Sequence, residues 1–238
     1  MKRVLLVFAV LLCLGVLAAG ALLYWVTTPG GASWISLAVS SRVQEQVPET
    51  KVEIRRLRFV PHFKVEAISV NWKTIDGTRI LSAGSVLLQT DPRRWIRGDC
   101  KWAVQVRQVE LDLAALDRTV GKGEWKAAGL LRGAIDLEGT AGAVERVETA
   151  LKADDPGGTL SGELMRQLLS FMPEGDARRQ LLTALKGQEL FHYQVGKIDV
   201  RTDESRYLVD LYLDGDHLLN LKIRVDKESV AVLKELIL

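Results

Sequence analysis

Cysteine and histidine are scarce in this chain, which holds two of the former and three of the latter among 238 residues. Cys13 lies within a long apolar run near the N-terminus, so Cys100 has no partner for a disulfide in the remainder of the chain. Cys100 is expected to be a small buried side chain rather than a reactive thiol. The fold must therefore depend on burial and on backbone pairing.

Sequence patterns of catalysis are missing as well. The histidines are scattered and occur in no HExxH, HxH or CxxC context, and no glycine-rich phosphate loop is present. The segment 158–162 differs from a nucleophile elbow, because its serine stands one position too late. Thr159 or Ser161 is expected to cap a helix instead. These absences argue against an enzyme.

Strong charge of one sign is also lacking, since the formal net charge is +2 and gives no reason to expect a nucleic acid partner. Asp154-Asp155 and Asp214-Gly215-Asp216 could bind Ca²⁺, but Asp and Gly are the ordinary residues of turns. We therefore predict no metal site, no catalytic residue and no cofactor.

A long hydrophobic run is present at the N-terminus. Residues 4–26 are apolar without interruption and follow Met1, Lys2 and Arg3. About 20 apolar residues cross the hydrocarbon core of a bilayer as a helix, and cationic flanks stay in the cytoplasm. We predict a cytoplasmic tip and a transmembrane signal anchor in region 1–26. A cleaved signal peptide is the alternative, because Ala19 and Ala21 form a small-x-small pattern, and it too sends the remaining chain across the membrane.

A linker and a short amphipathic helix are predicted in region 27–50. Thr, Pro, Gly and Ser dominate residues 27–33, and apolar positions then recur among polar ones from Trp34 to Val47. The helix could lie on the bilayer surface. Packing against the first sheet is the favoured alternative.

The fold class predicted for the rest is mainly β with α: a long-stranded antiparallel sheet with an inserted helical hairpin. Apolar and polar residues alternate in a β-sheet region, 51–158, and again in a C-terminal meander with a short terminal helix, 188–238. About nine strands, apolar on one face, are expected. Asp76-Gly77 and Asp214-Gly215 suit hairpin turns. The alternation slips at Arg107-Gln108, which predicts a β-bulge.

The helical hairpin is predicted in region 159–187, where the apolar period changes to that of a helix. The apolar faces expected of its two helices are Leu160, Leu164, Leu168 and Phe171 in the first, and Ala177, Leu181, Leu182 and Leu185 in the second.

The order of these features resembles that of the AsmA-like family, including its TamB and YdbH relatives. The resembling segments are Val52-Glu53-Ile54-Arg55-Arg56-Leu57, Ala67-Ile68-Ser69-Val70, Asp76-Gly77, Leu81-Ser82-Ala83-Gly84-Ser85-Val86-Leu87-Leu88, Trp95-Ile96-Arg97-Gly98 and Val106-Arg107-Gln108-Val109-Glu110-Leu111. The helical hairpin and the strands after it resemble the end of family members. The likeness covers most of the chain and includes no catalytic motif.

The resemblance implies a curved, taco-like β-groove that is apolar inside and holds phospholipid acyl chains. It also implies a single-pass protein of the bacterial inner membrane, with its bulk in the periplasm and a part in phospholipid transport or outer-membrane biogenesis. Large family members are several times longer, whereas about nine strands reach only roughly 40 Å. This chain is therefore expected to be a minimal member, which could stack with other chains through a sheet edge.

Two sets of residues follow as predicted contacts with lipid. The groove residues are Ile68, Val70, Trp72, Val104, Val106, Leu131, Ile135, Val209, Leu211, Leu221 and Ile223. The residues expected at the membrane surface are Arg93, Arg94, Trp95 and Arg97. A closed sandwich would bury the same apolar residues as an ordinary core, and a solvated loop would account for the arginines equally well.

An adaptor without a ligand is the second functional hypothesis. It would belong to a cell-envelope assembly or a secretion complex and would share the anchor and the β domain. Alternation along the sequence does not separate the two hypotheses.

Overall fold

The computed structural model of the protein describes residues 28–60, 64–90, 101–140, 143–153, 155–170, 174–204 and 206–226. The predicted anchor, the arginines expected at the membrane surface and the predicted terminal helix lie outside these residues, as does Cys100. Within them, no helix has both the length and the apolar character needed to span a bilayer.

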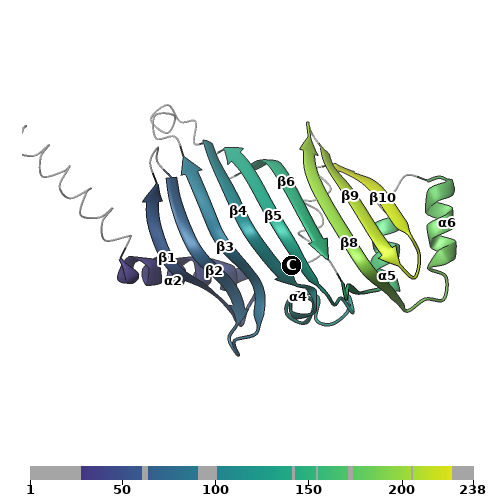
Figure 1. Ribbon diagram of the computed structural model, residues 1–238, viewed down its shortest axis with the longest axis horizontal. Coiled ribbons are helices and arrows are strands. Elements are labelled where there is room, and N and C mark those ends of the chain that lie inside the picture. Colours follow the sequence, from purple (N-terminus) through teal and green to yellow (C-terminus); the bar gives the residue numbers. More distant parts are fainter. Residues whose placement is uncertain are drawn as a thin grey trace, which may run out of the picture.

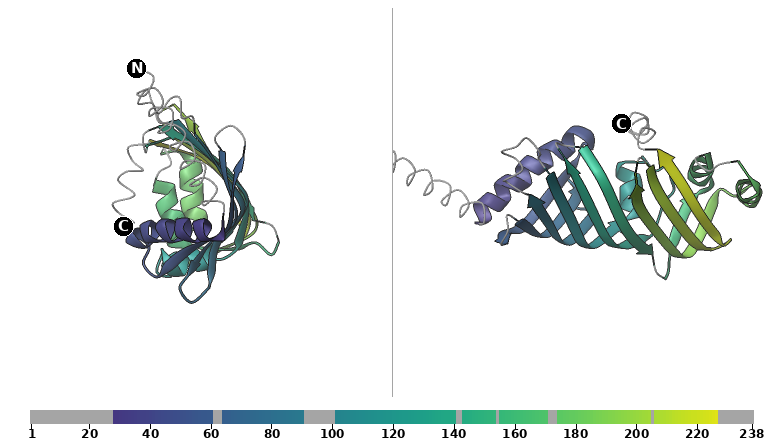
Figure 2. Two further views of the ribbon diagram at one scale, coloured as in Figure 1. Left: turned by 90° about the vertical axis from the view of Figure 1, so that its left-hand side faces the viewer. Right: turned by 90° about the horizontal axis from the view of Figure 1, so that it is seen from above.

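Ten strands form one antiparallel sheet that curves without closing (Figures 1 and 2). Strand order follows chain order from β1 to β10, except that short β7 pairs with β8 where β6 has ended. The mainly β, antiparallel and curved architecture is thus confirmed, and the sheet is not a two-sheet sandwich. The strands are β1 (Thr50–Val60), β2 (Lys64–Thr74), β3 (Arg79–Thr90), β4 (Lys101–Asp112), β5 (Leu130–Thr140), β6 (Ala143–Ala153), β7 (Gly158–Ser161), β8 (Leu190–Asp203), β9 (Arg206–Gly215) and β10 (Leu219–Asp226).

The turns differ in how well the sequence predicted them. Asp76-Gly77 connects β2 to β3 as expected, with Gly77 at φ +94°, a conformation that favours glycine. Asp214-Gly215, in contrast, still belongs to β9, and the connection to β10 consists of residues 216–218.

Helices lie on the inner side of the curve at both ends of the sheet, as Figure 2 shows for α2 and for the α5–α6 pair. The described helices are α2 (Pro29–Gln46), α4 (Leu113–Thr119), α5 (Gly162–Ser170) and α6 (Asp176–Ala184). Helix α2 begins earlier than predicted, because the Thr28 hydroxyl caps it by accepting from the Gly31 N–H at 3.3 Å. It packs against the first strands of the sheet, the favoured alternative.

The inserted helical hairpin is present, but its first helix begins later than predicted. Leu160 belongs to β7, and Ser161 caps α5 by accepting from the Leu164 N–H at 3.0 Å. Met165 and Leu169 of α5, one turn apart, are fully buried, and Leu164 is half-buried, whereas the predicted contact Phe171 lies outside the described residues. In the second helix Leu182 is exposed, contrary to the prediction, while Leu185 at the helix end is buried.

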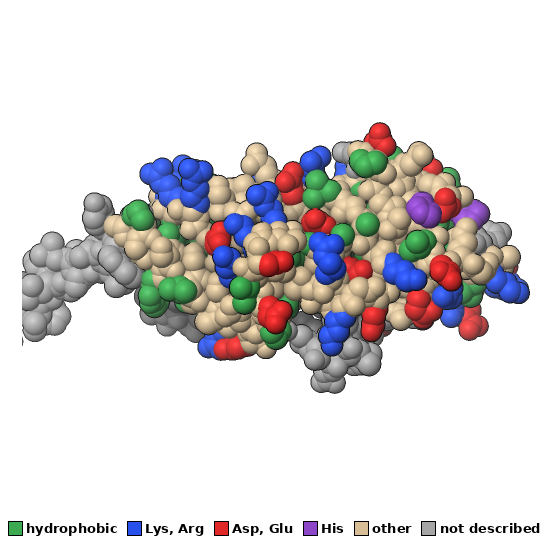
Figure 3. Space-filling view, turned by 90° about the horizontal axis from the view of Figure 1, so that it is seen from below, with side chains coloured by type: hydrophobic (Ala, Val, Ile, Leu, Met, Phe, Trp, Pro, Cys, Tyr) green, Lys and Arg blue, Asp and Glu red, His purple; other side chains and the backbone are tan. Residues whose placement is uncertain are grey.

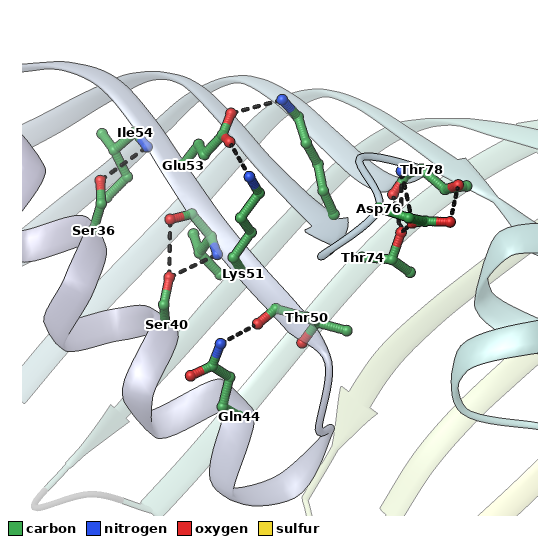
Figure 4. A network of polar contacts seen from close by, with 12 residues as sticks. Ser36, Ser40, Gln44, Thr50, Lys51, Glu53, Ile54, Thr74, Asp76 and Thr78 are labelled. Atoms are coloured by element: carbon green, nitrogen blue, oxygen red, sulfur yellow. Dashed lines mark hydrogen bonds and ion pairs between the residues drawn. The ribbon is translucent and has the colours of Figure 1, made fainter.

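The outer edge of β1 is covered by hydrogen bonds from α2 (Figure 4). The Ser40 hydroxyl accepts from the Val52 N–H at 2.7 Å and donates to the Val52 carbonyl at 3.0 Å. Ser36 accepts from the Ile54 N–H at 3.0 Å, and the Gln44 amide donates to the carbonyl of Thr50 at 2.7 Å. These three side chains follow at four-residue spacing, so they share one helix face. They satisfy edge groups that would otherwise invite another strand.

Strands β1 to β4 each carry an interruption at the same level of the sheet, which we call the bulge line. The predicted bulge at Arg107-Gln108 is confirmed by a register shift between β4 and β5 and by Gln108 at φ +53°. Ser69 adopts the same left-handed conformation at φ +55°. The residues of the bulge line are Arg55-Arg56, Ile68-Ser69, Gly84-Ser85 and Arg107-Gln108. At each pair two consecutive residues face outward, so the inward positions are three residues apart instead of two.

Candidate functional site

The concave face of the sheet is apolar from its first strand to its last. Cross-strand register places Val104 between Leu88 of β3 and Leu137 of β5, and the same row continues with Val147 of β6. Directly paired residues share a face of the sheet, so this row identifies the concave side throughout. The convex side carries the charged residues of the same strands.

Helices cover the two ends of this concave face and bury the side chains beneath them. Ala32 of α2 packs with Leu57 and Ala67 of the first two strands. Met165 and Leu169 of α5, with Leu185, pack on the concave residues of β8, β9 and β10. The deepest core of the molecule therefore lies under the α5–α6 pair.

A stretch of the concave face between these helices remains half-buried. Phe59 is 41% exposed and Leu88 is 38% exposed, although both point to the concave side. Further half-buried side chains on this stretch are Val65, Val86, Trp102, Val104, Val106, Ile135, Leu137, Val147, Val200, Val209 and Tyr207. This set crosses most of the strands, and we call it the concave strip.

The predicted groove residues divide into three groups. Leu131, Leu211, Leu221 and Ile223 are buried in the core. Val70, Trp72, Val104, Val106, Ile135 and Val209 are half-buried on the concave face. Ile68 is the exception, because it pairs with Arg56 and Ser85 on the convex side.

Ile68 is displaced to the other face by the left-handed conformation of Ser69. Ala67 and Val70 both pack against α2, so the two residues between them must point away from it. A strictly alternating interpretation grouped Ile68 with Val70, whereas the bulge shifts the alternation by one residue. Ile68 therefore does not belong to the groove candidates.

Sequence reasoning missed several residues of the concave strip, among them Phe59, Leu88, Trp102 and Leu137. Phe59, Leu88 and Trp102 stand within three residues of a strand end, and Leu137 stands three residues before the end of β5. The signal that could have identified them is that each continues the alternation of apolar and polar residues in its strand.

Trp72 contributes an unpaired donor to the concave face. Its indole Nε1 is buried and makes no hydrogen bond within the described part of the chain. A buried donor without a partner costs about 1–3 kcal/mol, so such groups are usually satisfied by a ligand or by solvent. The nitrogen is enclosed by protein atoms, so a ligand on the open part of the concave face does not reach it in this conformation.

The convex face is polar, and many of its charges form ion pairs between neighbouring strands. Arg107 binds Asp136 at 2.7 Å, and Arg206 binds Asp226 at 2.8 Å. Side chains of both signs are interspersed over the surface in Figure 3, and histidines lie close together near one end. Such mixed surfaces are typical of a solvated face.

His192, near the start of β8, forms one of these pairs with Asp216. The carboxylate accepts from the His192 backbone N–H at 2.9 Å and lies 3.1 Å from Nδ1. These hydrogen bonds, the backbone one first, lower the pKa of Asp216. The pair borders a cavity of about 880 Å³ that glycine backbone and Lys152 also line. Across the described ranges, no three His, Cys, Asp or Glu side chains converge on a position for a metal ion.

Comparison with protein-family models, curated proteins and solved structures gives no match.

Proposed function

We propose that this protein is a lipid-binding protein of the bacterial inner membrane, with its β domain in the periplasm and a part in phospholipid transport or outer-membrane biogenesis. Acyl chains would lie on the concave strip, and the protein would perform no chemistry. The resemblance to the AsmA-like family motivates the location and the process.

The observation that carries this proposal is the concave strip on a sheet that does not close. An open apolar surface between two helix-covered ends offers a trough for chains of methylene groups. Each methylene removed from water contributes about 0.8 kcal/mol, so a pair of acyl chains would bind without specific polar contacts.

The test is native mass spectrometry of the gently extracted full-length protein, followed by identification of the lipid that stays bound. Val104→Asp places a carboxylate in the strip, and Ile68→Asp places one on the convex face as a matched control. We expect stoichiometric phospholipid on the wild type and on Ile68→Asp. We expect at least a tenfold loss, or about 1.4 kcal/mol, in Val104→Asp.

Folding of both variants is checked by circular dichroism and denaturant unfolding. A folded Val104→Asp variant that retains its lipid would contradict the proposal, as would a wild type without lipid. If Val104→Asp does not fold, the milder Val104→Thr variant replaces it, with the same comparison.

An adaptor function is the second candidate, and the edge of β10, which pairs with no further strand among the described residues, favours it. The described sheet ends at β10, whereas α2 covers the opposite edge. Lys222 and Arg224 stand on the convex side of this edge strand, and Leu221 and Ile223 on the concave side. A partner strand that alternates acidic and apolar residues would complement it.

A photo-crosslinking amino acid at position 222 tests the adaptor function in cells. Position 56, on the convex side of covered β1, is the control. A defined envelope partner captured at 222 alone, together with a lipid-free protein, would support the adaptor function. Equal capture at both positions would contradict it.

A further inference from the structure

A hollow of about 1110 Å³ lies on the convex face where the bulge line crosses the sheet. It is lined by Arg55, Ser69, Gly84 and Gln108 from the bulge line itself. Arg79, Asn71, Ser82, Glu53, Glu110 and Arg132 complete its polar lining. We call it the convex hollow. It exists because successive residues turn outward at the same level in four neighbouring strands.

The polar groups of the convex hollow differ from the ion-paired charges elsewhere on this face. The side chains of Arg55, Arg79, Ser82 and Gln108 form no hydrogen bond or ion pair with the described residues. Such groups remain available to a ligand. By contrast, Arg107 immediately beside Gln108 is held by Asp136 at 2.7 Å.

The acidic groups of the convex hollow are already neutralised by neighbours. Glu53 binds the Lys73 ammonium at 2.6 Å and that of Lys51 at 3.1 Å (Figure 4), and Glu110 binds Arg132 at 2.9 Å. The Lys73 ammonium first, and then that of Lys51, lowers the pKa of the Glu53 carboxyl. The positive charges of Arg55 and Arg79 are therefore left uncompensated.

Gly84 leaves room for the side chain of Gln108 in the convex hollow. The amide of Gln108 extends over Gly84, and a Cβ added at this glycine would collide with it. Gln108 itself stands at φ +53°, a conformation that L residues rarely adopt. Two guanidinium groups that line one hollow with a hydroxyl and an amide form the kind of donor set that phosphate oxygens prefer.

We infer that the convex hollow binds a phosphate ester, which is either a free phosphorylated solute or the headgroup of a phospholipid. Arg55 and Arg79 contact the phosphate oxygens, and Ser82 and Gln108 contact the remainder of the molecule. This site lies on the opposite face of the sheet from the concave strip, so it does not rest on the binding of acyl chains.

The experiment is calorimetric titration of the full-length protein in detergent with two soluble probes. Glycerol 3-phosphate is a monoester, and glycerophosphoglycerol is the deacylated diester of a phospholipid headgroup. We expect saturable binding of at least one probe, with roughly tenfold weaker affinity in Arg55→Gln and in Arg79→Gln. Arg224→Gln is the control, since this exposed arginine stands on the same face but outside the hollow.

The two probes distinguish the sources of the ligand, because preference for the diester indicates a lipid headgroup and preference for the monoester a free solute. Gly84→Ala supplies an independent variant, which must displace the Gln108 amide and weaken binding without removing a charge. The inference is overturned if neither probe binds. It is also overturned if Arg224→Gln weakens binding as much as the arginine variants of the hollow.

Discussion

At the scale of single residues, a few hydroxyl groups decide how the sheet ends. Ser40 is 8% exposed and both donates to and accepts from the backbone of Val52. A strand edge that is satisfied by side chains cannot be recognised from hydropathy, since serine at four-residue spacing looks like an ordinary polar helix face. The sequence therefore predicted that α2 packs on the sheet but not that it completes the edge of β1.

Ser40→Ala is predicted to lower the free energy of unfolding by about 1–3 kcal/mol, because it leaves a buried N–H and carbonyl of Val52 without partners. Denaturant unfolding measures this loss. The control is Ser41→Ala, whose exposed hydroxyl binds only the carbonyl of Ala38 within α2. Equal losses in the two variants would show that the bonds to β1 are not responsible.

The buried phenol of Tyr193 predicts that the stability of the folded protein falls at alkaline pH. The side chain is 2% exposed, and burial raises the pKa of its phenol to about 12. A folded-state pKa above the unfolded value of about 10 means that the stabilisation is complete below pH 10. It is lost as the pH rises toward 12, because the unfolded chain releases the proton first.

Tyr193→Phe is therefore predicted to flatten this alkaline loss of stability. At neutral pH the variant should be less stable by about 1 kcal/mol, since the hydroxyl donates to the carbonyl of Ala128 at 3.1 Å. Unfolding titrations at pH 8, 10 and 11 supply the comparison, and parallel pH curves for the two proteins would refute the assignment.

At the scale of elements, the bulge line sets which residues face the concave side. The polar pair Arg107-Gln108 revealed the slip in β4, because two consecutive polar residues interrupt an apolar alternation. The slip in β2 was hidden, since apolar Ile68 precedes Ser69 and continues the expected pattern. The existence and order of the strands could be predicted from the alternation. The face on which Ile68 lies depends on the backbone conformation of Ser69, which the hydropathy of the sequence does not indicate.

Gln108→Gly is predicted to stabilise the protein, or to leave its stability unchanged, because glycine adopts φ +53° without the steric cost of a side chain. Gln105, exposed in the regular part of the same strand, is the control. Gln105→Gly should destabilise by roughly 0.5–1 kcal/mol. Denaturant midpoints that fall equally in both variants would exclude the left-handed conformation of Gln108.

At the scale of the whole molecule, two apolar clusters of unequal size hold the sheet. The cluster under α2 consists of Ala32, Leu57 and Ala67 with partly buried neighbours. The cluster under α5 and α6 includes large side chains such as Phe191 and Met165. The larger cluster removes more apolar surface from water and is expected to dominate the stability.

Native-state hydrogen exchange is predicted to show different opening free energies at the two ends of the sheet. Amides of β1 and β2 should exchange through an opening of lower free energy than those of β8 and β9, because local stability follows the packing beneath each segment. Exchange measured by mass spectrometry at increasing denaturant concentration separates the two. A single opening free energy for all four strands would show that the sheet unfolds as one unit.

The bulge line also constrains which insertions and deletions the first four strands can tolerate in evolution. Deleting one residue at Arg107-Gln108 would restore strict alternation in β4 and keep Val106 and Val109 on the concave side, but it would displace Val104 and Val106 by one residue from their partners Leu88 and Val86 in β3. Their neighbours in β3 would still face inward, so the row of paired side chains would break at that strand. Matching deletions at all four interruptions would be needed to keep the row intact. A deletion in β4 alone would therefore move the register shift from the β4–β5 pair to the β3–β4 pair, whereas equal lengths in the first four strands keep their concave rows aligned.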